Sequence, residues 1–471
     1  MKELGTESNP LRVAIIGAGP AGFYAAERLF KEKGLSVEVD MYDKLPTPFG
    51  LVRAGVAPDH QKIKSVTKIF DRVATRPEFR FFGYVDIGED ITVTELEEYY
   101  HQIVYTTGAQ TDRNLNIPGI DLQGSHAATG FVAWYNGHPD YRQREFDLSV
   151  QSAAVIGIGN VALDVARILS RSTKELAETD IADYALEALR HSNIRDVYIL
   201  GRRGPAQGKF TSPELKELGE MHEAEIIVRP DEAELDDLSE ASLAQADRGT
   251  LRQVEIIQKY AEREPEGKPR RLHLRFLVSP TELIDDGNGH VKAMKLVRNE
   301  LYKTEAGTLR PRSTGDEEVI DVGLVFRAVG YRGVPIKGVP FNDDWGVIMN
   351  VKGRVVDEAT HEPKVGHYTA GWIKRGPSGV IGTNKPDAAE TVELMLADMA
   401  NGLVLDPDHP AVEDAEEMVR EHQPEFFTYD DWLRLDKLEI ERGQEVGRPR
   451  LKFTRISDMM AARVGWRKVV D

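Results

Sequence analysis

Short runs of apolar residues alternate with segments of helical periodicity along much of this chain. The run Val13–Ile16 predicts a buried parallel strand, and the alanine-rich segment after it, up to Phe30, predicts a helix. The order recurs about 140 residues later, where SAAVI precedes a helical pattern with one apolar face. That face consists of Ala162, Val165, Ala166 and Leu169. The alternation predicts an α/β fold with parallel sheets.

Glycines follow the first predicted strand directly, in the order Gly17-Ala-Gly19-Pro-Ala21-Gly22. A strand, a GxGxxG motif and a helix in this order are typical of a dinucleotide site. Gly17 permits the tight turn, Gly19 lets the backbone approach a pyrophosphate, and Gly22 lets helix and strand pack closely. The pyrophosphate is expected on the free N–H groups at the start of the helix. The next predicted strand, SVEVDMY, ends at Asp43, whose carboxylate can accept hydrogen bonds from a ribose.

A second motif follows the second strand and ends in alanine where the first has glycine. Its residues are Gly157, Gly159, Asn160, Val161 and Ala162, and the fingerprint allows this final alanine. The next strand of this half, DVYIL, leads to Arg202 and Arg203 where an NAD site would offer a carboxylate. Two guanidinium groups can clamp a 2′-phosphate, so this motif is expected to take NADP; a plain surface pair is the alternative.

Composition restricts how such a protein can carry electrons. The chain has 471 residues and no cysteine. Its length favours two or more domains. The missing thiols exclude disulfides, thiolate metal sites, protein-ligated iron–sulfur clusters and cysteine nucleophiles, and we expect no metal. Redox chemistry then needs organic cofactors, and the two strand ends assign FAD to the first motif and NADP(H) to the second.

Charge and hydropathy indicate a soluble protein that avoids nucleic acid. The net charge is −18, which repels nucleic acid at long range. No apolar run approaches the roughly 20 residues that span a bilayer, and the N-terminal MKELGTESNP lacks the apolar core of a signal peptide. We expect a cytoplasmic protein; a cleaved transit peptide on a longer precursor stays open.

Nearly the whole chain resembles the adrenodoxin-reductase-type ferredoxin–NADP reductases, including their close bacterial members. The resemblance lies in IIGAGPAGFYAA, LPTPFGLVRAGVAPDH, RFFG, GAQTDRNLNIPG, IGIGNVALDVARIL, GRRGPAQGKFTSPELKEL, RAVGYRGVPIKGVPF and GWIKRGPSGVIGTNKPDAAETV. It implies an enzyme in which NADPH gives a hydride to FAD, followed by single-electron transfers to a ferredoxin-type iron–sulfur protein. An NADPH oxidase or diaphorase with a small-molecule acceptor is the alternative enzyme, and a flavin-bearing sensor without turnover is the third hypothesis.

The resemblance also implies roles for individual residues. Those at the FAD are Asp43, Leu51, Ile87, Trp372, Gly379, Val380 and Ile381. Those at the NADP are Arg113, Asn160, Val161, Arg202, Arg203 and Glu214. His60, Glu217 and Asp164 would act near the reacting groups.

Each of these assignments has a simpler structural alternative. His60 can be a loop histidine bonded to backbone, because hydride transfer needs no strong acid or base. Trp372 can be a core aromatic. Glu214 and Glu217 can be solvated, or Glu214 can serve the helix dipole. Asp164 can pair with Arg167 three residues later.

Two departures from the family pattern bear on the cofactor sites. Asp43 stands where bacterial members commonly carry Glu, and its shorter side chain should reach one ribose hydroxyl. Gly208 and Lys209 follow the arginine pair where small apolar residues are expected. NADP binding stays the expectation, but the sequence does not define in detail which residues contact the adenosine end of NADP.

The order of the motifs predicts two doubly wound domains, the NADP domain inserted into a discontinuous FAD domain. The expected ranges are 1–112 and 337–471 for FAD, with a helical, acidic C-terminal extension from Asp406, and 113–336 for NADP. The active site is expected in the cleft between the domains. The basic residues from Arg248 to Arg275 are either a solvated face or a docking patch for an acidic ferredoxin. A monomer is preferred.

Overall fold

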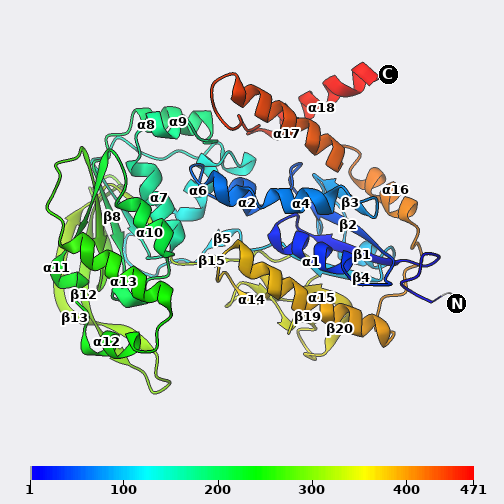
Figure 1. Cartoon of the computed structure of the whole chain (residues 1–471), viewed down its shortest axis with the longest axis horizontal. Helices are drawn as coiled ribbons and strands as arrows, with labels where there is room; N and C mark the ends of the chain where they lie inside the picture. The colour runs from blue at the N-terminus through cyan, green and yellow to red at the C-terminus, as the bar shows by residue number, and fades with distance from the viewer. Residues whose placement is uncertain (1–2, 471) are drawn as a thin grey trace. The chain divides into compact units, whose positions relative to one another are not determined.

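The computed structural model describes residues 3–470 and divides the chain into two compact units (Figure 1). The first unit comprises Met1–Val56, His60–Thr111 and Tyr331–Asp471, and the second comprises Ala57–Asp59 and Asp112–Gly330. The second unit is thus inserted into the first, with one short additional segment. The main crossings follow residues 111 and 330, where the sequence predicted residues 112 and 336.

The first unit contains a seven-stranded sheet in the order β18-β19-β20-β4-β1-β2-β3. Strands β20, β4, β1, β2 and β3 are parallel, and β18 and β19 extend the sheet with antiparallel pairs. The strands of the unit are β1 (Leu11–Ile16), β2 (Val37–Asp43), β3 (Phe79–Gly83), β4 (Gln102–Tyr105), β15 (Tyr331–Arg332), β16 (Phe341–Asn342), β17 (Val347–Ile348), β18 (Asn350–Val351), β19 (Arg354–Val356) and β20 (Pro363–Thr369); β5 (Thr111–Asp112) lies at the crossing. Its helices are α1 (Pro20–Phe30), α2 (Leu51–Ala54), α3 (Gln61–Lys64), α4 (Thr67–Ala74), α5 (Val93–Glu97), α14 (Trp372–Arg375), α15 (Asn384–Ala400), α16 (Val412–His422), α17 (Tyr429–Gln444) and α18 (Ile456–Val470).

Strand β1 is buried on both faces, as its uninterrupted apolar run predicts. Val13 and Ile15 pack into one core cluster with α1 and α15, whereas Ala14 and Ile16 pack into another with Tyr42 and Phe82. Helices α1 and α15 lie side by side over the first of these clusters (Figure 1). The carboxyl end of β1 is therefore held rigidly where the first glycine motif begins.

The chain after Asp406 adds three helices to the first unit. Gly83 at the end of β3 and Phe427 exchange two backbone hydrogen bonds of 2.8 Å. Trp432 of α17 is 2% exposed and lies in the core cluster of β1 and α1. The C-terminal helices are thus built into the core around the first motif.

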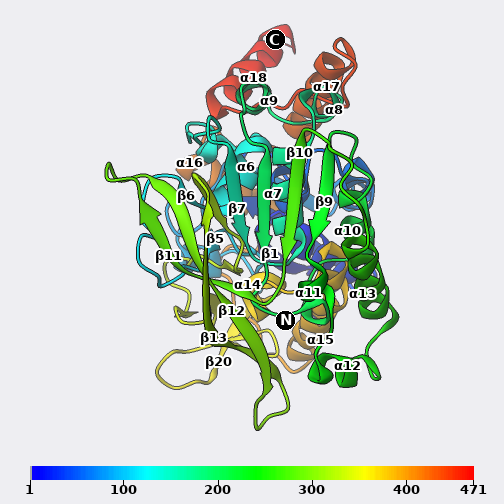
Figure 2. The ribbon, with the colours of Figure 1, turned by 90° about the vertical axis from the view of Figure 1, so that its left-hand side faces the viewer.

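The second unit contains a six-stranded parallel sheet in the order β6-β14-β7-β8-β10-β9. Figure 2 shows β10 and β9 side by side, with α13 next to β9. The strands of the unit are β6 (Ser125–Ala127), β7 (Ser152–Ile156), β8 (Asp196–Leu200), β9 (Ala224–Val228), β10 (Arg270–Arg275), β11 (Val278–Asp285), β12 (Val291–Lys303), β13 (Leu309–Asp321) and β14 (Leu324–Arg327). Its helices are α6 (Ala128–Tyr135), α7 (Asn160–Ser170), α8 (Thr173–Leu176), α9 (Asp183–Arg190), α10 (Ser212–Leu218), α11 (Pro230–Ala233), α12 (Asp237–Leu243) and α13 (Arg248–Ala261).

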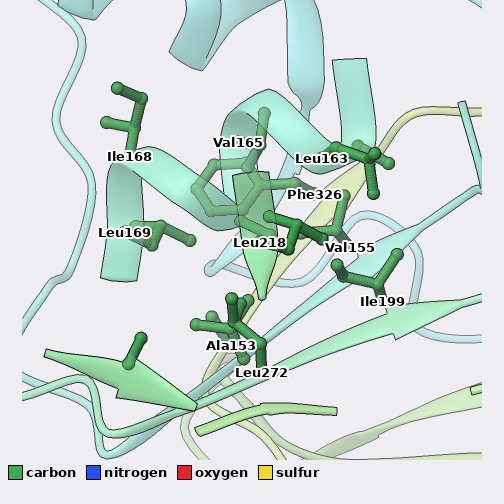
Figure 3. Packing of buried hydrophobic residues seen from close by; sticks show 14 of the residues in the cluster. Ala153, Val155, Leu163, Val165, Ile168, Leu169, Ile199, Leu218, Leu272 and Phe326 are labelled. Atoms are coloured by element: carbon green, nitrogen blue, oxygen red, sulfur yellow. The ribbon is translucent and has the colours of Figure 1, made fainter. Parts of the chain in front are cut away.

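Helix α7 packs on the parallel sheet with the apolar face that the sequence predicts. Val165 and Leu169 of α7 lie in one buried cluster with Val155 of β7 and Ile199 of β8 (Figure 3). On the other side, residues of β11 and β12 cover Ala154 and Ile156. These strands form an antiparallel sheet with β13.

None of the helices in residues 3–470 is long and apolar enough to cross a membrane.

His101 makes the stability of the first unit depend on pH. It is 8% exposed and its Nδ1 accepts the backbone N–H of Arg12 at 3.0 Å. Burial, with help from the charge of Arg12, lowers its pKa to about 4. Because the unfolded chain takes up this proton near pH 6.5 and the folded chain does not, the free energy of unfolding falls between pH 6.5 and 4.

Replacing His101 with asparagine keeps an acceptor and removes the titration. We expect the variant to lose less stability than the parent over this pH range, by up to about 3 kcal/mol. Chemical denaturation at pH 7 and pH 4 measures the difference. Equal losses in both proteins would show that His101 does not contribute.

Candidate cofactor sites

The first glycine motif forms a cradle with one open side. Gly17 has φ +109°, and a Cβ on it would lie 2.8 Å from the carbonyl carbon of Thr106. A Cβ on Gly22 would lie 2.4 Å from the Gly17 oxygen, whereas one on Gly19 would meet no atom within 4 Å. Gly17 and Gly22 are therefore required by the chain itself, and Gly19 leaves space where a pyrophosphate can approach. These residues fit the FAD that the motif predicts.

Alanine at these positions separates folding from binding. Gly19→Ala should leave the melting temperature of the FAD-free protein unchanged and weaken FAD binding by at least about tenfold. Gly22→Ala should also destabilise the FAD-free protein by about 1–3 kcal/mol, because its methyl group overlaps backbone. Thermal unfolding of the apoprotein and FAD titration measure the two effects. Tight FAD binding by Gly19→Ala would contradict the site.

Asp43, at the end of β2, is bound to the glycine loop. Its Oδ2 accepts the Ala18 N–H at 2.8 Å and its Oδ1 accepts the Leu45 N–H at 2.9 Å. Burial raises its pKa, and the two N–H donors oppose that shift. The carboxylate thus fixes the loop, and each oxygen keeps a lone pair on the side away from these bonds. Its contact with a ribose stays a prediction.

The other predicted FAD residues of the N-terminal part differ in burial. Leu51 begins α2 and is 37% exposed, and the preceding Gly50 lies against the motif, since its Cβ would be 3.1 Å from the Gly19 Cα. Ile87 is 6% exposed and packs into the core cluster that contains Ile16. Leu51 therefore directly follows the glycine that contacts the motif, while Ile87 packs in the core below the end of β1.

The segment around Trp372 adjoins the start of α1. Gly371 has φ +80°, and a Cβ on it would lie 2.6 Å from the Ala21 Cβ, so this glycine is needed for the approach. Trp372 is partly exposed, stacks on Tyr331 with ring centroids 5.5 Å apart, and donates from Nε1 to the Ser378 carbonyl. It is therefore not a fully buried core residue. The following residues Gly379 and Val380 are exposed and Ile381 is partly exposed.

Asp387 holds this segment, and the sequence analysis did not identify it. Its Oδ2 accepts the Gly371 N–H at 2.5 Å, and its Oδ1 lies 3.3 Å from both Lys374 Nζ and Arg375 Nε. Lys374 is itself 8% exposed. The only sequence signal was the position of Asp387 in the first turn of a helix after Pro386, which also suits a helix-dipole role.

The second glycine motif repeats this cradle in the second unit. Gly157 has φ +137°, and a Cβ on it would lie 2.3 Å from the Ala328 oxygen, while one on Gly159 would meet no atom within 4 Å. Ala162 is fully buried and Val161 packs partly against the same core. Asn160 Oδ1 accepts the Thr211 N–H at 2.8 Å, so its side chain joins the two loops beside the motif. The open side at Gly159 fits the pyrophosphate of NADP.

The unusual Gly208-Lys209 pair has a structural reason. A Cβ on Gly208 would lie 2.6 Å from Nε2 of Gln253 and 2.8 Å from the ring of Phe210. The Lys209 N–H donates to the Ile158 oxygen at 2.8 Å, and its side chain is exposed. Neighbouring side chains therefore leave no room for a Cβ at Gly208, a backbone hydrogen bond fixes Lys209, and neither position needs an apolar side chain.

Arg202 and Arg203 follow β8 as the sequence predicts, and their charges lie close together. Arg202 is exposed and Arg203 is partly buried. Burial lowers the pKa of Arg203, and the charge of Arg202 lowers it further. In the described part of the chain neither guanidinium pairs with a carboxylate. Two like charges without an acid between them fit an anion such as the 2′-phosphate.

The predicted catalytic acids of the second unit surround a buried arginine. Asp164 Oδ1 accepts from Arg167 at 2.7 Å, which is the ion pair that the sequence offered as the alternative. Glu217 lies 3.9 Å from Arg167 and is 39% exposed. Asp59 binds Arg167 through both oxygens, at 2.6 and 3.1 Å. Asp164 and Glu217 thus share a charged cluster, and Asp59 was missed because it lies over 100 residues away in sequence.

Of the remaining predicted residues, His60 and Arg113 lie close to the crossings between the units and Glu214 lies on α10. His60, the first residue after the Ala57–Asp59 segment, is 9% exposed and precedes α3, whose Ile63 N–H donates to the His60 oxygen. Arg113 is exposed, and its N–H donates to the Gly330 oxygen at 2.9 Å. Glu214, in the first turn of α10, accepts from the Thr211 hydroxyl at 3.0 Å.

Comparison with known proteins agrees with two dinucleotide sites. The family model for pyridine nucleotide-disulphide oxidoreductases matches residues 11–217. The chain is 44% identical over 464 residues to the NADPH-ferredoxin reductase FprA of Mycobacterium tuberculosis, covering 97% of this chain and 100% of that protein. It is 39% identical to the mitochondrial NADPH:adrenodoxin oxidoreductase of Arabidopsis thaliana, covering 97% and 96%.

A solved structure of Mycobacterium tuberculosis FprA in complex with NADPH superimposes with a TM-score of 0.91 at 43% identity, covering 97% of this chain and 100% of that chain. The similarity thus extends over both units, including the residues after 217 that the family model does not match. The chain belongs to the family of NADPH-ferredoxin and NADPH:adrenodoxin oxidoreductases.

Proposed function

We propose that this protein is an FAD-dependent NADPH:ferredoxin oxidoreductase. The observation that carries the proposal is the contrast between two glycine cradles of similar shape. The first leads to a strand that ends at Asp43, and the second leads to a strand followed by Arg202 and Arg203, which pair with no carboxylate among the described residues. When bound, FAD accepts a hydride from NADPH and can release its electrons singly to an iron–sulfur protein. The relatives named as ferredoxin and adrenodoxin reductases supply the class of acceptor.

Different residues of the chain then bind different parts of the two cofactors. Gly17, whose N–H donates to the Tyr42 oxygen, and Gly22 shape the loop; Gly19 and the first residues of α1 leave room for the FAD pyrophosphate; and Asp43 positions the loop and offers an acceptor to the ribose. Arg202 and Arg203 select the 2′-phosphate of NADPH. For His60, Glu217 and Asp164 we propose roles in orienting groups near the reaction, since hydride transfer itself needs no proton donor.

Steady-state reduction of cytochrome c by NADPH, with and without added ferredoxin, tests the proposal. Added ferredoxin is expected to stimulate the reduction at least about tenfold, because the iron–sulfur protein carries single electrons from the flavin to cytochrome c. Fast NADPH consumption with oxygen or a quinone and no response to any ferredoxin would favour an oxidase or diaphorase. Tight FAD binding without turnover would favour a sensor.

Docking of an acidic ferredoxin is proposed for one face of α13. Arg248, Arg252 and Lys259 are exposed and recur on one side of this helix, where Arg252 also pairs with the exposed Glu255 at 2.9 Å. The remaining basic residues of the predicted patch lie after the helix and bind within the unit: Arg263 to Gly219, Lys268 to Met221, Arg270 to Ser170 and Arg171, Arg271 to Asp196, and Arg275 to Glu232 and Glu318. The proposed docking surface is therefore limited to the basic residues on α13 and does not include the whole stretch from Arg248 to Arg275.

Glutamine at these three α13 positions should raise the KM for ferredoxin and flatten its dependence on salt, because the long-range attraction is removed. NADPH reduction of FAD should stay unchanged. Arg310→Gln, at an exposed site on β13, is the matched control. An unchanged KM for ferredoxin would mean that this face of α13 is only a solvated surface.

We further propose that the protein works as a monomer in the cytoplasm. A chain without cysteine needs no oxidising compartment to fold.

A further inference from the structure

A strained turn lies against the glycines of the first motif. Phe49 has φ +82° and Gly50 has φ +47°, and both values lie in the region that side chains disfavour. The Phe49 N–H donates to the Ala18 oxygen at 2.7 Å, and Gly50 approaches the Gly19 Cα. At Phe49 such a conformation costs about 1–3 kcal/mol and persists only where its surroundings hold it, whereas Gly50 adopts a positive φ without this cost. The surroundings of this turn therefore decide the shape of the cradle.

Those surroundings come from the far end of the sequence. Arg53 of α2, just after the turn, donates from its two terminal nitrogens to both oxygens of Glu439 on α17, at 2.8 and 2.5 Å. Its guanidinium also lies 5.0 Å from the ring centroid of Trp432. The ring of Phe49 meets Trp432 edge to face, with centroids 5.7 Å apart. Helix α17 thus holds the turn through one ion pair and one aromatic contact.

Glu439 is the centre of this arrangement. Its side chain is fully buried, and it also accepts from Arg450 at 3.3 Å and from the Phe453 N–H at 2.8 Å. Lys452 donates to the Arg53 carbonyl oxygen at 3.1 Å. Burial opposes ionisation of Glu439, yet Arg53 and Arg450 lower its pKa, so the carboxylate stays charged. A buried charge with these partners specifies one geometry, unlike an exposed ion pair.

We propose that Tyr429–Phe453 acts as a clamp on the turn Phe49–Gly50, and that Glu439 is the positioning residue that sets how tightly FAD is retained. Glu439 acts through Arg53 and does not need to touch the cofactor. The inference rests on the proposed assignment of FAD to the first unit. It goes beyond that assignment by giving the C-terminal helices a role in cofactor retention.

The test compares Glu439→Gln with Glu441→Gln on the same helix. Glu441 is half exposed and its carboxylate lies 3.7 Å from Lys437 on the surface. The rate of FAD release is followed by the rise in flavin fluorescence after dilution of the holoprotein, and apoprotein unfolding is measured separately. Glu439→Gln should release FAD about tenfold faster or more, and Glu441→Gln should match the parent. A lowered apoprotein melting temperature with unchanged FAD release would overturn the proposal, since that result indicates a purely structural role.

Arg53→Lys provides a second variant if Glu439→Gln does not fold. Lysine keeps a charge opposite Glu439 and loses the two-pronged geometry, so FAD release should again quicken and the visible circular dichroism of the bound flavin should change. Release at the parental rate in this variant would equally overturn the clamp. Cytochrome c reduction by the parent protein with added ferredoxin keeps the two proposals apart. If no ferredoxin accepts electrons while Glu439→Gln still releases FAD faster, the clamp stands and the proposed function falls.

Discussion

Replacement of Arg202 and Arg203 by alanine is expected to lower kcat/KM for NADPH by about 10²- to 10⁴-fold, because each charge-assisted hydrogen bond to a phosphate contributes about 1.5–3 kcal/mol. The value for NADH should change by less than about threefold, since that coenzyme has no 2′-phosphate to lose. The loss should appear mainly in KM, because the 2′-phosphate is remote from the transferred hydride. Anaerobic reduction of the bound flavin by each coenzyme, followed by absorbance, measures this selectivity directly.

The pair is suited to this test because neither arginine has a carboxylate partner in the described residues. Its removal therefore leaves no buried acid unpaired, and relief of the repulsion between the two charges should keep the unit stable. Arg310→Ala serves as the control for removing an exposed cation. Equal losses with NADPH and NADH would mean that the arginines support the strand end and do not choose the coenzyme.

The sequence predicted the parts of the fold that depend on local pattern. The apolar run before Gly17 and the strand that ends at Asp43 have the predicted positions, because parallel strands buried on both faces leave a continuous apolar signal. The two glycine motifs also have the predicted geometry, since only glycine fits at Gly17 and Gly157. The inserted arrangement of the units followed from the order of these motifs.

Partners that are distant in sequence could not be predicted. Arg53 and Glu439 are 386 residues apart, and nothing in the sequence next to either residue indicates its partner. Asp387 looked like an ordinary acid in the first turn of a helix, although it holds Gly371 against α1. For the same reason the sequence could not show which residues of the basic stretch from Arg248 have partners; strand β10, for example, turns Arg275 inward to Glu232. A charge in a sequence does not show whether its partner is water or a buried carboxylate.

Replacement of Arg167 by methionine is expected to destabilise the second unit by about 3–5 kcal/mol. The side chain of Arg167 is fully buried and holds the carboxylates of Asp59 and Asp164. Burial opposes its charge, but the two acids raise its pKa, so the cation is fixed. Methionine fills a similar volume, but each of the two carboxylates loses its hydrogen bonds to Arg167. Calorimetry should show the transition of this unit lowered by roughly 10 °C, whereas Arg190→Met, at an exposed pair with Glu187, should have almost no effect.

Asp164→Asn then separates the two roles that the sequence left open for this residue. If Asp164 serves only the ion pair with Arg167, the variant should lose stability by about 1–3 kcal/mol and reduce its flavin with NADPH at the parental rate. If it also acts near the reacting groups, the rate of flavin reduction should fall at saturating NADPH, at a temperature where the protein is fully folded. Asp59 supplies the internal comparison, because it binds the same arginine from a different segment. A rate that falls in Asp164→Asn and not in Asp59→Asn would assign the catalytic role to Asp164 itself, whereas parallel losses would assign both acids to holding Arg167.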